Sequence, residues 1–238
     1  MSHEFTRTEL LIGKRGLISL SKAHILVFGI GGVGSYVVEA LARSGVGTLT
    51  LVDNDEVMIS NINRQLVALH STIGKFKTEV AKERVKDINP NILVHTYQTF
   101  YDAQTSRLFD FKEYDYVVDA IDTVTSKLLI IEQAKASKTP VISCMGTGNK
   151  LDPSRLEITD ISKTSVCPLA KVMRLELRKR RIKKVKVLYS KEQPIKIIET
   201  NTGTKGQGNT PTVGSVAYVP ATAGLMIAGE VIKELINE

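Results

Sequence analysis

Short runs of apolar residues alternate along the first 150 residues with segments in which apolar residues recur at helical spacing. The runs predict strands buried on both faces, because polar positions do not alternate within them. They cover His24–Gly29, Thr48–Asp53, Ile92–Tyr97, Tyr114–Asp119 and Pro140–Cys144. Helical spacing predicts helices over Val33–Ser44, Lys77–Lys86 and Val124–Ser137. Strands that alternate with helices pair in parallel through right-handed crossovers, so the pattern predicts an α/β fold with a doubly wound, mostly parallel sheet.

The pattern changes after about residue 150, where the helices and strands no longer alternate regularly. We expect strands at Arg155–Ile161, Val185–Tyr189 and Ile195–Glu199, helices at Pro168–Lys179 and Pro220–Leu235, and a Gly/Thr-rich loop from Asn201 to Gly214. This half is an α+β extension in which antiparallel strands are expected. We therefore divide the chain into a core of residues 1–150 and an extension of residues 151–238 within the same globular unit.

The length of 238 residues suits one large domain with a sizeable core. The two cysteines, Cys144 and Cys167, are too few for a disulfide framework, a four-cysteine zinc site or an iron–sulfur cluster. The first residues lack the apolar stretch of a signal peptide, and the apolar run at 216–228 is too short to span a bilayer. We expect a cytoplasmic protein without an integral membrane span.

Positive charge is concentrated in one segment of the extension. Between Lys163 and Lys196 there are twelve basic residues and two acidic ones, whereas the whole chain has a net charge of +7. Such a field attracts polyanions, and nucleic acid is the natural candidate because its condensed counterions are released on binding. A solvated helix face rich in Lys and Arg is the alternative.

A glycine-rich loop, Gly29-Ile30-Gly31-Gly32-Val33-Gly34, lies between the first strand and the first helix after it. Gly29 permits a tight turn, Gly31 lets the backbone approach a phosphate, and Gly34 lets helix and strand pack closely. Asp53 ends the second strand, where it can accept hydrogen bonds from ribose hydroxyls. The loop predicts a nucleotide site but does not choose between NAD, FAD and ATP.

The polar residues that follow favour a triphosphate. Asp55 can bind a divalent cation, while Arg64 and Lys77 can neutralise phosphate charge. Asp122 follows the fourth strand and so comes to the same edge of the sheet. Each of these residues alone has a structural explanation, such as a helix cap or a surface ion pair. All four residues are expected near the ends of successive strands, and this combination favours an enzyme that cleaves ATP.

The glycine loop, the stretch Asp-x-Asp-x-Val-x-x-x-Asn-x-x-Arg-Gln from Asp53 to Gln65, Lys77 and Asp122 together resemble the ThiF/MoeB/ubiquitin-activating superfamily. Its Rossmann-like members use ATP to adenylate a carboxylate. The resemblance implies that Asp53 holds the ribose and that Asp55 and Asp122 bind the Mg²⁺ of Mg-ATP. It also implies contacts to adenosine or phosphates from the residues Asn61, Arg64, Gln65 and Lys77. Arg7 is similar to the arginine that such enzymes extend across a homodimer to the ATP of the partner.

Further stretches are similar to one branch, the tRNA threonylcarbamoyladenosine dehydratases. They are Arg7–Gly13, Asp160–Thr164, Pro168-Leu169-Ala170, Gly214–Pro220 and Ala228–Ile232. The two Cys-x-x-Cys pairs usual in MoeB-type and ThiF-type enzymes are absent from this sequence. The resemblance implies that the substrate is a modified adenosine beside the tRNA anticodon and that the basic segment binds the tRNA backbone. Two alternatives stay open: an adenylyltransferase for a ubiquitin-like sulfur carrier, and a nucleotide-sensing module that binds nucleic acid without turnover.

The implied chemistry requires no protein nucleophile. Adenylation makes the carboxylate of threonylcarbamoyladenosine electrophilic, and the nearby ureido group can then close a five-membered ring and expel AMP. We therefore expect no catalytic role for Cys167, although it lies where some relatives in the superfamily form a thioester or persulfide. Cys144 is expected in the core. The residues His24, His70 and His95 lack metal-ligand spacing.

Overall fold

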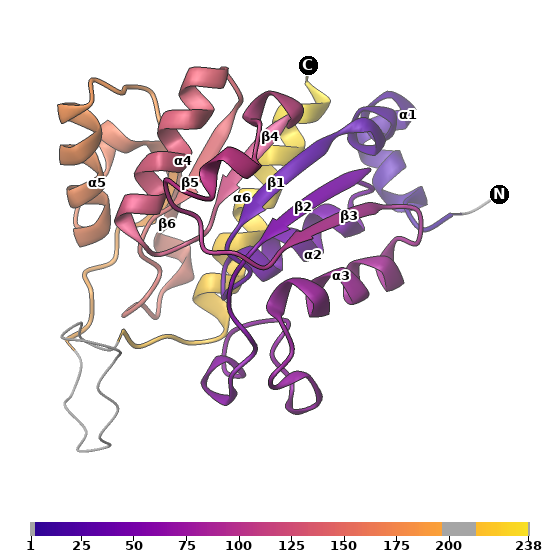
Figure 1. The fold of residues 1–238 in the computed structure, drawn as a ribbon, viewed down its shortest axis with the longest axis horizontal. Coiled ribbons are helices and arrows are strands. Elements are labelled where there is room, and N and C mark those ends of the chain that lie inside the picture. The colour runs from indigo at the N-terminus through magenta and orange to yellow at the C-terminus, as the bar shows by residue number, and fades with distance from the viewer. Residues whose placement is uncertain (1–2, 197–212, 238) are drawn as a thin grey trace.

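The computed structural model describes residues 3–196 and 213–237 and contains one sheet of seven strands in the order β3-β2-β1-β4-β5-β7-β6 (Figure 1). All neighbouring strands are parallel except β6 and β7, which are antiparallel. The strand order runs outward from β1 in both directions, as in doubly wound folds. The predicted fold class is therefore confirmed.

The elements correspond closely to those predicted. The strands are β1 (His24–Phe28), β2 (Thr48–Val52), β3 (Leu93–Tyr97), β4 (Tyr116–Asp119), β5 (Val141–Cys144), β6 (Leu156–Asp160) and β7 (Lys186–Ser190). The helices are α1 (Thr6–Lys22), α2 (Gly34–Arg43), α3 (Lys77–Ile88), α4 (Val124–Ser137), α5 (Pro168–Lys179) and α6 (Tyr218–Ile236). With one exception, each predicted helix and strand is present within two residues of its expected ends.

The exception is the strand expected at Ile195–Glu199. Residues 195 and 196 are not in a strand, and the remainder lies outside the described residues, as does most of the expected Gly/Thr-rich loop. The expectation of antiparallel strands holds only for β6 with β7, because β7 itself pairs in parallel with β5. The extension thus continues the sheet of the core.

Helix α1 was not predicted. Its apolar residues do not form one stripe: Leu20 is fully buried, whereas Leu10 and Leu11 are 82% and 88% exposed. Gly13, with φ of 69°, also interrupts the helical backbone. Because helical periodicity is recognised from a continuous buried face, it gives no signal here. Among the described residues, no helix is both long and apolar enough to cross a membrane.

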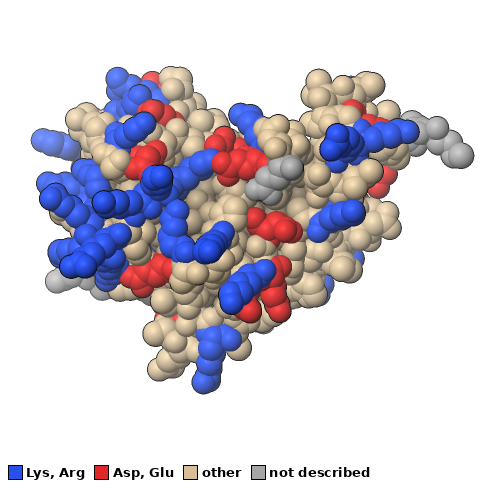
Figure 2. All heavy atoms as spheres, turned by 90° about the horizontal axis from the view of Figure 1, so that it is seen from above, with Lys and Arg blue, Asp and Glu red and all other residues tan. Residues whose placement is uncertain are grey.

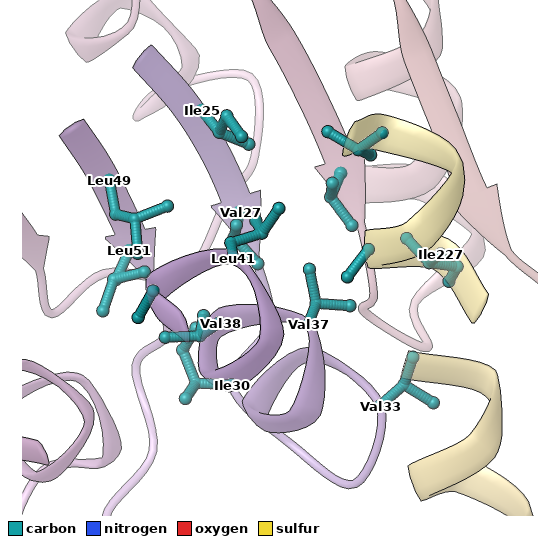
Figure 3. Packing of buried hydrophobic residues seen from close by; sticks show 14 of the residues in the cluster. Ile25, Val27, Ile30, Val33, Val37, Val38, Leu41, Leu49, Leu51 and Ile227 are labelled. Atoms are coloured by element: carbon teal, nitrogen blue, oxygen red, sulfur yellow. The ribbon is translucent and has the colours of Figure 1, made fainter. Parts of the chain in front are cut away.

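The core has two sides, one on each face of the sheet. Along β1, Ile25 and Val27 pack with residues of α2 and α6 (Figure 3). Leu26 and Phe28 face a second cluster that includes residues of α4. A side chain buried in this way contributes about 1.5–3 kcal/mol. A Cβ on Gly224 of α6 would come within 2.4 Å of the Val33 carbonyl oxygen, so the two helices cross at close range. This contact places the start of α6 near the glycine loop.

Candidate nucleotide site

The glycine loop lies at the point where the strand order reverses. Strand β1 has β2 on one side and β4 on the other, and all three end at the same edge of the sheet. Gly29 follows β1 with φ of 85°, and its N–H donates to the Val52 carbonyl at 2.8 Å. A Cβ there would lie 2.7 Å from the Ala120 carbonyl oxygen, so only glycine fits. In doubly wound sheets, ligands bind in the crevice at this point.

The loop presents free backbone donors to that crevice. Within the described part of the chain, the N–H groups of Gly31, Gly32, Val33 and Gly34 make no hydrogen bond. They stand at the N-terminus of α2, where the helix dipole favours an anion. Gly34 cannot carry a side chain, because its Cβ would lie 1.7 Å from the Gly29 carbonyl oxygen. These features fit a phosphate group.

The Asp53 carboxylate holds the glycine loop in place through a hydrogen bond and also faces the crevice. Its carboxylate accepts hydrogen bonds from the N–H of Ile30 at 2.6 Å and from the N–H of Asp55 at 2.8 Å. Burial raises the pKa of the Asp53 carboxyl above its ordinary value, although Lys77 and these hydrogen bonds oppose the rise. Each carboxylate oxygen can accept a second hydrogen bond, so capacity for ribose hydroxyls remains.

Lys77 and Asp55 form an ion pair beside Asp53. The Lys77 ammonium lies 2.7 Å from Asp55 Oδ2, and the Lys77 N–H donates to the Asp55 carbonyl at 3.0 Å. Lys77 is buried at the start of α3, whereas Asp55 is exposed. The two residues predicted to serve the phosphates and the metal are therefore in direct contact. A phosphate that reaches Lys77 must share it with Asp55.

Arg64 and Gln65 approach the glycine loop from the segment after β2. A Cβ on Gly32 would lie 3.5 Å from Arg64 Cγ and 3.3 Å from Pro220 Cβ of α6. The Arg64 guanidinium donates to the carbonyl of Ser60 at 2.9 Å, and further N–H groups remain for a ligand. Gln65 is buried, and its Oε1 has no partner among the described residues. A buried unpaired acceptor is costly, and an adenine amino group is the kind of donor that would satisfy it.

Asn61 shapes this segment from within. It is buried, and its Oδ1 accepts from the N–H of Met58 at 3.0 Å. The neighbouring Asn63 donates to the Ser215 carbonyl at 3.0 Å, which ties the segment to the chain just before α6. Neither Asn63 nor Pro220 was a predicted site residue. Their partners lie more than 150 residues away along the sequence, so no local pattern could predict these two residues.

Asp122 is exposed at the end of β4 and is held by residues that were also not predicted. Asp119, three residues earlier, is fully buried and bound to the fully buried Lys127 of α4 at 2.9 Å. The Lys127 ammonium also donates to the Ile121 carbonyl at 3.0 Å, and Ser143 donates to Asp119. The Lys127–Asp119 pair therefore fixes the turn that presents Asp122. Asp119 ends a strand predicted to be buried, and a buried carboxylate requires a partner, so the sequence did carry a signal for a cation such as Lys127.

Arg7 does not join this site within its own chain. Phe5, two residues before it, packs against Gly45 beyond the C-terminal end of α2, whereas the glycine loop lies at the N-terminal end. Arg7 is exposed and makes no ion pair with any described residue. The ten residues of α2 place roughly 15 Å between its two ends.

The cysteines and histidines stand apart from this arrangement. Cys144 and Cys167 are both buried and free, and burial raises the pKa of the Cys144 thiol to about 12. His24 hydrogen-bonds to Thr50 at 2.8 Å. The part of the chain that the structure describes contains no group of three or more His, Cys, Asp or Glu residues placed to hold a metal ion.

The basic segment is less positive in the fold than in the sequence. Acids from elsewhere in the chain neutralise part of it: Lys186 is bound to Glu230 and Glu234, and Lys191 to Glu157. A further basic residue, Arg180, pairs with acids on α4 and α5. The excess counted along the sequence is therefore wrong as a measure of free charge, because these ion pairs join distant segments.

The model of the ThiF family matches residues 5–238. The tRNA threonylcarbamoyladenosine dehydratase of Bacillus subtilis (strain 168) is 45% identical over 245 residues, covering 100% of this chain and 96% of the relative. The enzyme of the same name from Haemophilus influenzae is 41% identical over 236 residues, covering 93% and 89%. The crystal structure of Escherichia coli tRNA N6-threonylcarbamoyladenosine dehydratase in complex with ATP superposes with a TM-score of 0.88 at 33% identity, covering 98% of this chain and 94% of that one. The resemblance stated from the sequence is confirmed.

Proposed function

Since the chain belongs to the ThiF family, we propose that it is an ATP-dependent dehydratase of N6-threonylcarbamoyladenosine in tRNA. One observation carries this proposal: free backbone donors, Arg64 and Lys77 converge on the crevice beside Asp53, in a chain that matches dehydratases over nearly its whole length. Residues 1–150 hold ATP, and residues 151–238 contribute most of the tRNA-binding surface. The proposed location is the cytoplasm.

The reaction proceeds in two steps at this crevice. The threonyl carboxylate attacks the α-phosphorus of ATP, an acyl–AMP anhydride forms, and pyrophosphate leaves. A ureido nitrogen then attacks the acyl carbon, loses its proton, and AMP leaves as the five-membered ring closes. Arg64, Lys77 and the loop N–H groups stabilise the negative charge that grows on the phosphates. Ring closure within one bound molecule needs orientation more than a protein nucleophile.

Asp55 and Asp122 are the residues that would hold Mg²⁺ with ATP. The donor set fits, because Mg²⁺ takes one or two carboxylates together with substrate phosphates. Asp122 is exposed, and among the described residues its carboxylate contacts only the Thr123 hydroxyl, at 3.5 Å. Asp55 shares its charge with Lys77. When bound, Mg²⁺ would withdraw charge from the phosphates and so favour pyrophosphate departure.

The site is completed by a second copy of the chain. Helix α1 carries Arg7 together with the exposed Leu10 and Leu11, and exposed apolar surface of this kind is typical of interfaces. In a homodimer, Arg7 would reach the ATP of the partner. Mixing inactive Arg7→Ala with inactive Lys77→Met tests this, because shared sites restore AMP formation in the mixed dimers. No recovery in a mixture proved to exchange subunits would refute it.

An AMP-release assay tests the activity itself. The chain should form AMP from ATP with threonylcarbamoyladenosine-modified tRNA and not with the same tRNA lacking the modification. Arg64→Glu should abolish this turnover, whereas Arg107→Glu, an exposed charge reversal outside the site, should preserve it. Equal turnover by Arg64→Glu and wild type would overturn the assignment.

The second candidate is adenylation of the C-terminus of a ubiquitin-like sulfur carrier. The same phosphate loop and cations would serve it, because the acid is again a carboxylate. ATP–pyrophosphate exchange that depends on such a carrier and ignores modified tRNA would favour this candidate.

A further inference from the structure

Six basic residues from the end of α4, the end of α5 and the turn before β7 gather at the edge of the sheet opposite the nucleotide site. The glycine loop, Asp53 and Asp122 follow the carboxyl ends of β1, β2 and β4. The turn before β7 and the turn before β5 lie at the amino ends of these parallel strands. A five-residue strand spans roughly 16 Å, so at least that distance separates the two edges.

Six exposed basic residues form this surface, which we call the amino-edge surface. They are Lys135 and Lys138 near the end of α4, Arg178 in α5, and Arg181, Lys183 and Lys184 in the turn before β7. The last turn of α4 contacts the turn before β7, because the Lys135 ammonium donates to the Lys184 carbonyl at 2.7 Å. Seen from the top of Figure 1, Lys and Arg crowd one side of the molecule (Figure 2).

Little negative charge offsets this surface. None of its six members forms an ion pair with a described residue. Of the nearby acids, Glu132 and Glu176 are both bound to Arg180, which is not one of the six, and Asp160 is the acid that lies near Lys135. The positive field is therefore available to an external polyanion.

Three members occupy backbone conformations that favour glycine. Lys138, Arg181 and Lys184 have φ of 62°, 58° and 57°, and the described residues contain only two other non-glycine positions with positive φ. Glycine adopts this left-handed conformation without steric cost, whereas a side chain does not. A positive charge near a helix C-terminus has a dipole benefit, which falls off within the last turn and so does not account for Lys184. The chain keeps charge where conformation alone would select glycine.

We propose that the amino-edge surface binds the phosphate backbone of an RNA stem at a distance from the reacting nucleoside. The inference rests on the proposed function, since a tRNA extends well beyond one modified base. Basic side chains on phosphates position a nucleic acid without reading its sequence. The surface therefore contributes affinity for any tRNA and leaves recognition of the modification to the opposite edge.

The variant Lys138→Gly/Arg181→Gly/Lys184→Gly tests this directly. Glycine suits all three backbones, so the variant should fold and melt at or above the wild-type temperature. Loss of three phosphate contacts should make the slope of log affinity against log salt shallower by about 2–3, which is roughly a 100- to 1,000-fold loss of tRNA affinity at 0.1 M salt. Modified and unmodified tRNA should lose affinity equally, and KM should rise for tRNA but not for ATP.

The control Lys14→Gln/Lys22→Gln/Lys86→Gln removes the same charge from exposed positions on α1 and α3. It should keep the wild-type salt slope. If the glycine variant and this control change tRNA binding equally, or if the glycine variant binds as the wild type does, the inference is wrong. That result would leave the proposed function intact, because AMP release with modified tRNA is measured separately on the wild type.

Discussion

Replacement of Lys127 by methionine should destabilise the fold severely. Lys127 and Asp119 are both 0% exposed, with 2.9 Å between the ammonium and Oδ2, so the variant leaves a buried carboxylate with Ser143 and one N–H as neighbours. Removal of one partner of a buried ion pair costs about 3–5 kcal/mol. For a chain of this length each kcal/mol shifts the melting temperature by about 2–4 °C, so we expect a fall of about 6–20 °C.

Urea unfolding followed by circular dichroism measures this cost, since the chain has no tryptophan. The double variant Lys127→Met/Asp119→Asn should be more stable than Lys127→Met alone, because the neutral amide removes the unpaired charge and still accepts from Ser143. Lys86→Met, an exposed lysine on α3, should stay within about 0.5 kcal/mol of wild type. A cost below about 1 kcal/mol for Lys127→Met, or a double variant at the sum of the single costs, would refute the reasoning.

Three further predictions concern other parts of the molecule. Gly34→Ala should lower the melting temperature and abolish ATP binding, because the added Cβ would collide with the Gly29 carbonyl oxygen. In the control Gly31→Ala, the atom nearest to the added Cβ is 3.8 Å away, so this variant should melt like wild type. Equal melting temperatures for the two variants would contradict the prediction. Burial alone would raise the pKa of Glu39, but Arg84 and Arg43 outweigh it and lower that pKa. Stability from Glu39 is therefore present above its unfolded pKa and lost as the pH falls through the lowered folded pKa. Glu39→Gln should melt below wild type at pH 7, and the difference between the two melting temperatures should shrink as the pH falls below the ordinary range of a glutamate. A difference that stays constant with pH would count against the ion pairs. Cys167→Ser should retain AMP formation, because ring closure uses no thiol, and a folded variant without turnover would restore a catalytic role for this residue.

The helices and strands could be predicted from the sequence more accurately than the contacts between them. Buried strands such as β1 consist of consecutive apolar residues, which is a local signal, so their positions followed within two residues. Helix α1 gave no such signal, because Leu10 and Leu11 lie in solvent. For the site, the residues that follow β1, β2 and β4 could be predicted, because parallel strands bring their carboxyl ends together.

The contacts that hold the site could not be predicted in the same way. Lys127 lies within an apolar helix, and nothing nearby in the sequence identifies Asp119 as its partner. The excess of basic residues was visible along the chain, but the ion pair of Lys186 with Glu230 depends on tertiary structure. The number of basic residues counted along a segment is therefore an upper limit on its free positive charge, because acids from distant segments can form ion pairs with them.

The contact between α6 and the glycine loop has a consequence for how the protein is made. A Cβ on Gly32 would lie against Pro220, so the fourth residue of the glycine loop acquires this neighbour only when α6 has folded against it. Synthesis proceeds from the N-terminus, and β1 emerges long before α6. The nascent chain therefore has an incomplete ATP crevice until α6 has left the ribosome, and turnover can begin only after that point.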